Sequence, residues 1–225
     1  MVKVKIVEKL EDVKKKINSI EYDPHWYRRV FHTFSASFIL YYMLPNLYWI
    51  NILKIWIPVT ILVLIFILEY MRIKGKIGSY HFFGLRMYEK KRIGSYLFFG
   101  LAVFILLLFF PQQIAVPCIL CASIADPIMG EIRLRYGQKN VYLVGFFICM
   151  FFFLVSWYKA DLWVMLIVSL IGATGAVVGE TKKINYLDDD FMIQMVPAIL
   201  LLIILFFAGY FGFVLPDIII YPSII

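Results

Sequence analysis

The chain has 225 residues, of which 63% are hydrophobic and only 16% are charged. Soluble domains contain closer to a quarter of charged residues, and runs of about 20 apolar residues are typical of membrane spans. The composition therefore excludes an ordinary soluble protein and predicts an integral membrane protein without a separate soluble domain. Anionic lipid and the positive-inside rule account for the net charge of +7, so no nucleic-acid partner is expected.

The first 28 residues are rich in charge and predict an amphipathic helix on the cytoplasmic surface, not a cleavable signal peptide. A polytopic domain is expected over residues 29–217, followed by a C-terminal tail at 218–225. Its seven apolar runs lack the alternation of barrel strands, which predicts an all-α membrane protein of about seven transmembrane helices. They occupy residues 31–50, 53–71, 95–111, 113–132, 140–158, 162–179 and 193–215.

Several prolines lie within these runs or at their ends. Three are expected at helix ends, and three are expected inside helices, where neighbouring helices can satisfy the freed carbonyl groups. The first set is Pro45, Pro111 and Pro216, and the second is Pro58, Pro117 and Pro197.

Basic residues predict the orientation. Twenty of the 22 Lys and Arg residues precede the first run or follow the second, fourth and sixth. Because such residues are retained on the cytoplasmic side, the N-terminus is expected in the cytoplasm and the C-terminus outside. A plasma membrane and an endoplasmic reticulum both fit this pattern.

Ionisable residues within or beside the spans gather on the same predicted cytoplasmic side. They are Arg29, His32, Glu69, Arg72, Arg86, Glu89, Asp126, Arg135, Glu180, Lys182, Lys183, Asp188, Asp189 and Asp190. Such groups are costly inside a membrane and are usually functional. Carboxylates can hold Mg²⁺ while Arg and Lys bind phosphate oxygens, so the mixture predicts a metal-bound polyphosphate, most simply a nucleotide.

Several of these residues also have a structural interpretation. The three consecutive aspartates could cap the last helix, because Asp is favoured at helix N-termini. Glu69 and Arg72 have the spacing of a local ion pair, and His32 could be a packed histidine. Cys118 and Cys121 lie inside an apolar run and are expected to be packed thiols. Asp126, alone among apolar residues, is the strongest candidate for function.

A repeated phrase flanks the second basic loop. Ile-Gly-Ser-Tyr-x-Phe-Phe-Gly-Leu occurs at 77–85 and again at 93–101. The second copy begins an apolar run. The first is followed by Arg86 and Glu89, and we expect it to form an interfacial or re-entrant helix that delivers these two side chains to the site.

The ordered set of motifs resembles the membrane-bound CTP-dependent lipid kinases, which include dolichol and polyprenol kinase, phytol kinase and CTP-dependent diacylglycerol kinase. The resemblance extends from about residue 28 to residue 197. It rests on Arg28-Arg-Val-Phe-His32, Glu69-Tyr-Met-Arg72, Arg86-Met-Tyr-Glu89, Gly94-Ser-Tyr-Leu-Phe-Phe-Gly100, Ala125-Asp-Pro127, and Glu180 followed by Asp188-Asp-Asp-Phe191. The chain departs from the family pattern at Asp190, Gln194 and Arg133, where the family has asparagine, proline and a small residue.

The resemblance implies transfer of the γ-phosphoryl group of CTP to the hydroxyl of a polyprenol, giving polyprenyl phosphate and CDP. In that scheme Asp126 binds Mg²⁺ or holds the attacking hydroxyl, Asp188 and Asp189 share the metal, and His32 is a candidate base. The nucleotide-binding residues would be Arg86, Gly94, Ser95, Arg135, Lys182 and Lys183. The supporting residues would be Arg29, Glu69, Arg72, Glu89, Glu180 and Asp190.

Two other functions compete with this interpretation. A CTP:lipid-phosphate cytidylyltransferase would make a CDP-lipid and release pyrophosphate, but the double-glycine Asp-Arg-x-Asp signature expected for it is absent from the sequence. A secondary transporter would use Asp126 and Pro117 in a broken helix and would show inverted repeats, whereas the repeat at 77–101 is local and tandem. The oligomeric state is left open.

Overall fold

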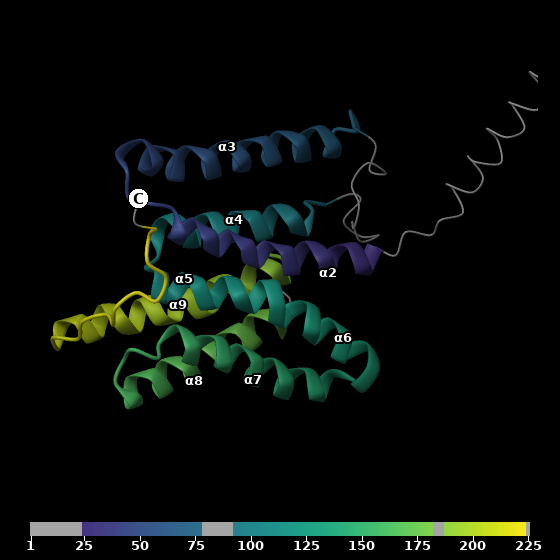
Figure 1. Ribbon diagram of the computed structural model, residues 1–225. Helices are drawn as coiled ribbons and strands as arrows, with labels where there is room; N and C mark the ends of the chain where they lie inside the picture. Colours follow the sequence, from purple (N-terminus) through teal and green to yellow (C-terminus); the bar gives the residue numbers. More distant parts are fainter. Residues whose placement is uncertain (1–23, 78–91, 182–186, 224–225) are drawn as a thin grey trace, which may run out of the picture.

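The computed structural model describes residues 24–77, 92–181 and 187–223, with side chains from residue 29 onward (Figure 1). Its elements are helices joined by short connections. They are α2 (Pro24–Ser35), the 3₁₀ helix η1 (Ala36–Met43), α3 (Tyr48–Ile73), α4 (Ser95–Phe109), α5 (Gln112–Leu120), the π-helical turn η4 (Cys121–Ala125), α6 (Asp126–Tyr136), α7 (Gln138–Ser156), α8 (Leu162–Thr181) and α9 (Asp189–Tyr210). The predicted all-helical class is confirmed for this part of the chain.

Five helical segments among the described residues are long and apolar enough to cross a membrane. They are α3, the continuous rod Gln112–Tyr136 made of α5, η4 and α6, and the helices α7, α8 and α9. α4 is equally apolar but shorter. The predicted surface helix at 1–28 lies almost entirely outside the described residues, as does the first copy of the repeated phrase.

Proline and glycine explain where the ends of the helices differ from those predicted. The first run was expected to continue to residue 50, but the helix ends at Met43. Leu44 is extended, with ψ 135°, because a residue that precedes proline disfavours the helical region. Phe110 is likewise extended before Pro111, so the helix ends expected at Pro45 and Pro111 are confirmed.

The expectation that Pro216 ends the last helix is wrong. α9 ends at Tyr210, and Gly212 follows with φ 80°, a conformation that glycine adopts readily. The expectation for the other three prolines is confirmed, since Pro58, Pro117 and Pro197 all lie inside helices.

The bundle has two distinct ends (Figure 1). At the end we call the α2 end, α2, α4 and α9 begin, and α3 and α8 finish. At the opposite end, which we call the strap end, the chain beyond α9 folds back across the bundle as residues 211–223, the strap. Backbone carbonyls of the strap accept hydrogen bonds from the side chains of Gln112, Gln113 and Lys159, and the N–H of Ser223 donates to the Met43 carbonyl at 2.9 Å.

Small residues on α8 allow close helix packing. A Cβ atom added at Gly172 would overlap the ring of Phe153 on α7, and one added at Gly179 would overlap the backbone carbonyl of Met192 on α9. α8 therefore lies very near both neighbours. This contact holds the first turn of α9 against the last turn of α8, where three aspartates and Glu180 occur in the sequence.

The helices differ greatly in how much of each is buried within the protein. In the rod Gln112–Tyr136, 67% of the apolar window is buried within the protein, whereas in α3 the fraction is 6%. The rod is thus the centre of the bundle. α3 packs on α4 and is otherwise peripheral.

Candidate functional site

Three side chains from distant parts of the chain meet near the α2 end. His32 Nδ1 lies 3.4 Å from an Asp126 carboxylate oxygen, and His32 Nε2 lies 3.8 Å from an Asp190 carboxylate oxygen. His32 and Asp190 are 8% and 1% exposed. The three come from α2, α6 and α9, so the tertiary fold, not local sequence, brings them together.

The π-helical turn η4 helps to hold the histidine. At its end the N–H of Asp126 bonds to the carbonyl of Cys121, five residues earlier. Continuing that pattern would pair the carbonyl of Ala122 with residue 127, but Pro127 has no N–H to donate. The Ala122 carbonyl instead lies 3.3 Å from His32 Nδ1, and π turns of this kind are frequent at functional sites.

Two further contacts fix the position of α2 over this turn. The hydroxyls of Ser35 and Ser123 are 2.9 Å apart, and Ser35 also donates to the carbonyl of His32. The ring of Phe99 on α4 packs against the imidazole with centroids 5.0 Å apart. His32 is therefore restrained by η4 on one side and by an apolar ring on another.

The aspartates at the start of α9 have unequal positions. Asp188 is the N-cap, and its carboxylate accepts from the N–H of Asp190 at 3.2 Å; the capping interpretation is confirmed for this residue. Burial, together with the neighbouring Asp189 and Asp190, raises the pKa of Asp188 to about 9. Crowded carboxylates with little water are an arrangement that a bound cation stabilises.

Glu180 extends the acidic cluster from α8. Its carboxylate accepts from Arg133 Nη2 at 2.5 Å and lies near enough to Asp126 and Asp189 to feel their charges. The second oxygen, Oε2, is buried without a hydrogen-bond partner among the described residues, as is Arg133 Nε. A buried carboxylate oxygen without a donor is costly, so this oxygen is available to a ligand.

A separate buried ion pair connects the end of α3 to the start of α4. Arg72 donates to both oxygens of Glu69, at 2.7 and 2.6 Å, and the predicted local pair is confirmed. The same carboxylate accepts from the N–H of Gly94 at 2.6 Å and from the hydroxyl of Tyr96, and Arg72 also donates to the carbonyl of Arg92. These bonds hold residues 92–94 against the last turn of α3.

A third group of charges lies at the surface of α6. Glu131 accepts from Arg29 at 2.6 Å and from Arg135 at 2.5 Å. Arg135 is largely exposed and Arg29 partly so. Arg29 lies on α2 together with His32, and Arg135 lies on α6 together with Asp126.

The fold brings some of the predicted site residues together and separates others. His32, Asp126, Glu180, Asp188, Asp189 and Asp190 form one cluster, whereas Glu69, Arg72 and Gly94 form the ion-pair group, with Ser95 buried at the start of α4. Arg86, Glu89, Lys182 and Lys183 lie outside the described residues. Sequence reasoning gave Asp190 only a supporting role and no role to Ser35 or Ser123, which lie in no motif. It also gave none to Phe99, although Phe99 lies inside the motif Gly94–Gly100.

The donor set fits a divalent cation. Two groups of potential ligands occur among the described residues: His32 with Asp126 and Asp190, and the three aspartates 188–190. In each group the ligand atoms lie within 4.8 Å of one another. Mg²⁺ prefers oxygen ligands and retains waters, so the carboxylates are the better ligands and His32 the better positioning group or base.

Comparisons with protein-family models, curated protein sequences and solved structures found no match. The class of the protein is therefore described from its fold and its site alone. Over the described residues the protein is helical, with five helices long and apolar enough to cross a membrane, and it has a largely buried His–Asp–Asp cluster beside further carboxylates.

Proposed function

We propose that this protein is a membrane-embedded CTP-dependent lipid kinase that phosphorylates a polyprenol. The observation that supports it best is the convergence of His32, Asp126 and Asp190 with the aspartates at 188 and 189. An acidic, cation-binding site near the end of an apolar bundle suits a reaction between a water-borne polyphosphate and a lipid hydroxyl. The choice of CTP and of polyprenol rests on the resemblance in the sequence.

In this proposal Asp126, Asp189 and Asp190 hold Mg²⁺ together with Asp188, and Arg29, Arg135 and the basic residues beyond α8 attract the triphosphate. Bound Mg²⁺ would neutralise charge on the phosphate oxygens. The lipid oxygen attacks the γ-phosphorus, the bond to the β–γ bridging oxygen breaks, and CDP leaves. With Nδ1 protonated toward the Ala122 carbonyl, His32 Nε2 retains a lone pair and accepts the hydroxyl proton.

The proposed topology has seven crossings, with the α2 end in the cytoplasm. α2 and η1 together form a helical segment about 34 Å long, which exceeds a hydrocarbon core of about 30 Å. α4 is shorter, and the extended residues on both sides of it add to the length of that crossing. The exposed cations Arg29 and Arg135 lie toward the α2 end, in agreement with the positive-inside rule, and the strap is then outside. The proposed location is a plasma membrane or an endoplasmic reticulum.

The test is phosphoryl transfer by purified protein in detergent, with Mg²⁺, CTP labelled at the γ position, and polyprenol or diacylglycerol as acceptor. We expect label in polyprenyl phosphate and release of CDP. Asp126→Asn should reduce the rate at least about a hundredfold, because it removes a charge from the site of phosphoryl transfer. The matched control is Asp161→Asn, an exposed aspartate between α7 and α8, which should retain the wild-type rate.

Other outcomes would contradict the proposal. Pyrophosphate release when lipid phosphates are supplied, without label in any lipid, would indicate a cytidylyltransferase. Equal loss of transfer in both variants would remove Asp126 from the site.

A further inference from the structure

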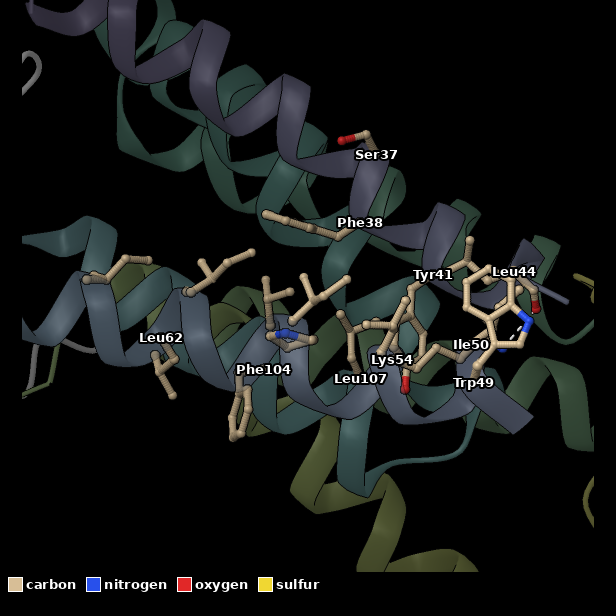
Figure 2. A pocket seen from close by; sticks show the side chains of 17 residues that line it. Ser37, Phe38, Tyr41, Leu44, Trp49, Ile50, Lys54, Leu62, Phe104 and Leu107 are labelled. Carbon is tan, nitrogen blue, oxygen red and sulfur yellow. Dashed lines mark hydrogen bonds between the residues drawn. The ribbon is translucent and has the colours of Figure 1, made fainter. Parts of the chain in front are cut away.

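An apolar groove lies between η1, α3 and α4, outside the acidic cluster (Figure 2). Its volume is about 420 Å³, and its walls are made almost entirely of aliphatic and aromatic side chains. Lys54 is its one charged residue, and the Lys54 ammonium donates to the Leu44 carbonyl at 2.8 Å. The aliphatic part of Lys54 therefore lines the groove while its charge is satisfied at the rim.

The groove is long. Along α3 it extends from Trp49 to Ile65, which corresponds to about 24 Å at about 1.5 Å per residue. One leaflet contributes only about 15 Å of hydrocarbon, half of the bilayer core. A groove of this length accommodates one chain that continues past the midplane.

One end of the groove lies one residue along α4 from a side chain that contacts the candidate site. Ile65 and Gly100 line the groove there, and a Cβ atom added to Gly100 would contact Ile65 at 3.7 Å. The neighbouring Phe99 packs its ring on His32 with centroids 5.0 Å apart. A chain lying in the groove would thus end near the turn of α4 whose Phe99 contacts the imidazole.

We propose that this groove binds the hydrocarbon tail of the acceptor, a single-chain lipid alcohol of isoprenoid length, with its hydroxyl toward His32. The assignment of a hydroxyl acceptor rests on the proposed kinase function; the site for the tail rests on the groove. The length of the groove disfavours diacylglycerol, because acyl chains confined to one leaflet of about 15 Å would leave the far end of the groove empty. The groove also gives the tail a defined path from Gly100 to Trp49.

Photo-crosslinking in phosphatidylcholine nanodiscs, without CTP or Mg²⁺, tests this path. Two long-chain polyprenols would carry a diazirine, one at the isoprene unit next to the hydroxyl and one far enough along the chain to reach Trp49. The first should label peptides around Ser37 and Phe99, and the second should label peptides around Trp49 and Lys54. Unlabelled polyprenol should compete, whereas diacylglycerol should not.

Matched variants on α3 separate the groove from the lipid-facing surface. Ile61→Trp fills the groove, whereas Val63→Trp points about 200° around the same helix. We expect the first to reduce labelling about tenfold or more and the second to leave it unchanged. Gly100→Leu offers an independent block, with Gly209→Leu, which has open space around it, as its control.

The result overturns the proposal if label spreads over the exposed face of α9, if diacylglycerol competes equally, or if both tryptophan variants lose labelling alike. Labelling of the groove without phosphoryl transfer would retain the tail site and reject the kinase. Phosphoryl transfer without labelling of the groove would reject the tail site and retain the kinase.

Discussion

Asp190 is the least solvent-exposed acidic residue in the candidate site. Its side chain is 1% exposed, and Gln194, one turn later in α9, donates to its backbone carbonyl at 2.9 Å. Asp188 and Asp189 are its neighbours in the chain, and Asp126 faces the same histidine. Like charges so close together disfavour one another. The folded protein therefore bears a local electrostatic cost that a divalent cation would remove.

Asp190→Asn tests this cost directly. We expect the variant to have a higher melting temperature than the wild type in the presence of a chelator, because one crowded charge is removed. It should also lose the stabilisation by Mg²⁺, which in the wild type would be about 1.4 kcal/mol at ten times the dissociation constant. Thermal unfolding in detergent with and without Mg²⁺ measures both effects.

Asp161→Asn is the control, and it should retain the wild-type response to Mg²⁺. A lower melting temperature of Asp190→Asn in chelator would show that Asp190 serves the fold, and an unchanged Mg²⁺ response would show that it holds no ion.

At the scale of elements, the site depends on two irregular contacts. Pro127 and the π turn leave the Ala122 carbonyl to His32, and Gly179 lets α9 approach the last turn of α8. The second contact sets where the aspartates of α9 lie relative to Glu180. Helix packing and site geometry are therefore coupled through a glycine that has no polar atom in the site.

Gly179→Ala should separate the two helices. The added Cβ would overlap a backbone carbonyl of α9, which cannot move as a side chain does, so we expect a loss of about 1–3 kcal/mol in stability. The Mg²⁺ response should fall as well, since the aspartates move away from Glu180. The control is Gly209→Ala, where nothing lies within 4 Å; a similar loss in both variants would refute the explanation by packing.

Apolar runs in the sequence predicted the helices well, because burial of backbone polar groups in lipid requires them. The ends at Pro45 and Pro111 followed from proline chemistry. Contacts between distant segments could not be predicted in the same way. The importance of Asp190 over Asp188 depends on which residue caps α9, and the pairing of Arg133 with Glu180 depends on how α6 crosses α8. No local pattern encodes either.

At the scale of the whole molecule, the strap links separate helices of the bundle at the end opposite the site. Gln112 is 7% exposed; its side-chain oxygen accepts from the N–H groups of Ile219 and Ile220 at 3.1 and 3.0 Å, and its amide donates to the Ile220 carbonyl at 2.9 Å. The strap also reaches Met43. It therefore ties the turn before α3 to the central rod.

Gln112→Leu should release the strap. Three backbone groups of half-buried residues would lose their partner, at a cost of up to about 1–3 kcal/mol each, so we expect a fall in melting temperature. Limited chymotrypsin digestion should cut after Phe211 and Phe213 faster than in the wild type. The exposed Gln138, at the start of α7, supplies the control Gln138→Leu, and equal digestion of both variants would contradict the role of Gln112.

The peripheral position of α3 has a consequence for enzyme kinetics. A groove beside a helix that is only 6% buried within the protein exchanges its contents with the bilayer sideways, so the aqueous volume of an assay is irrelevant to its occupancy. Under the proposed function, the rate at saturating CTP would follow the mole fraction of polyprenol in the membrane. Diluting vesicles with buffer would leave this rate per enzyme unchanged, whereas diluting the polyprenol with inert phospholipid would lower it.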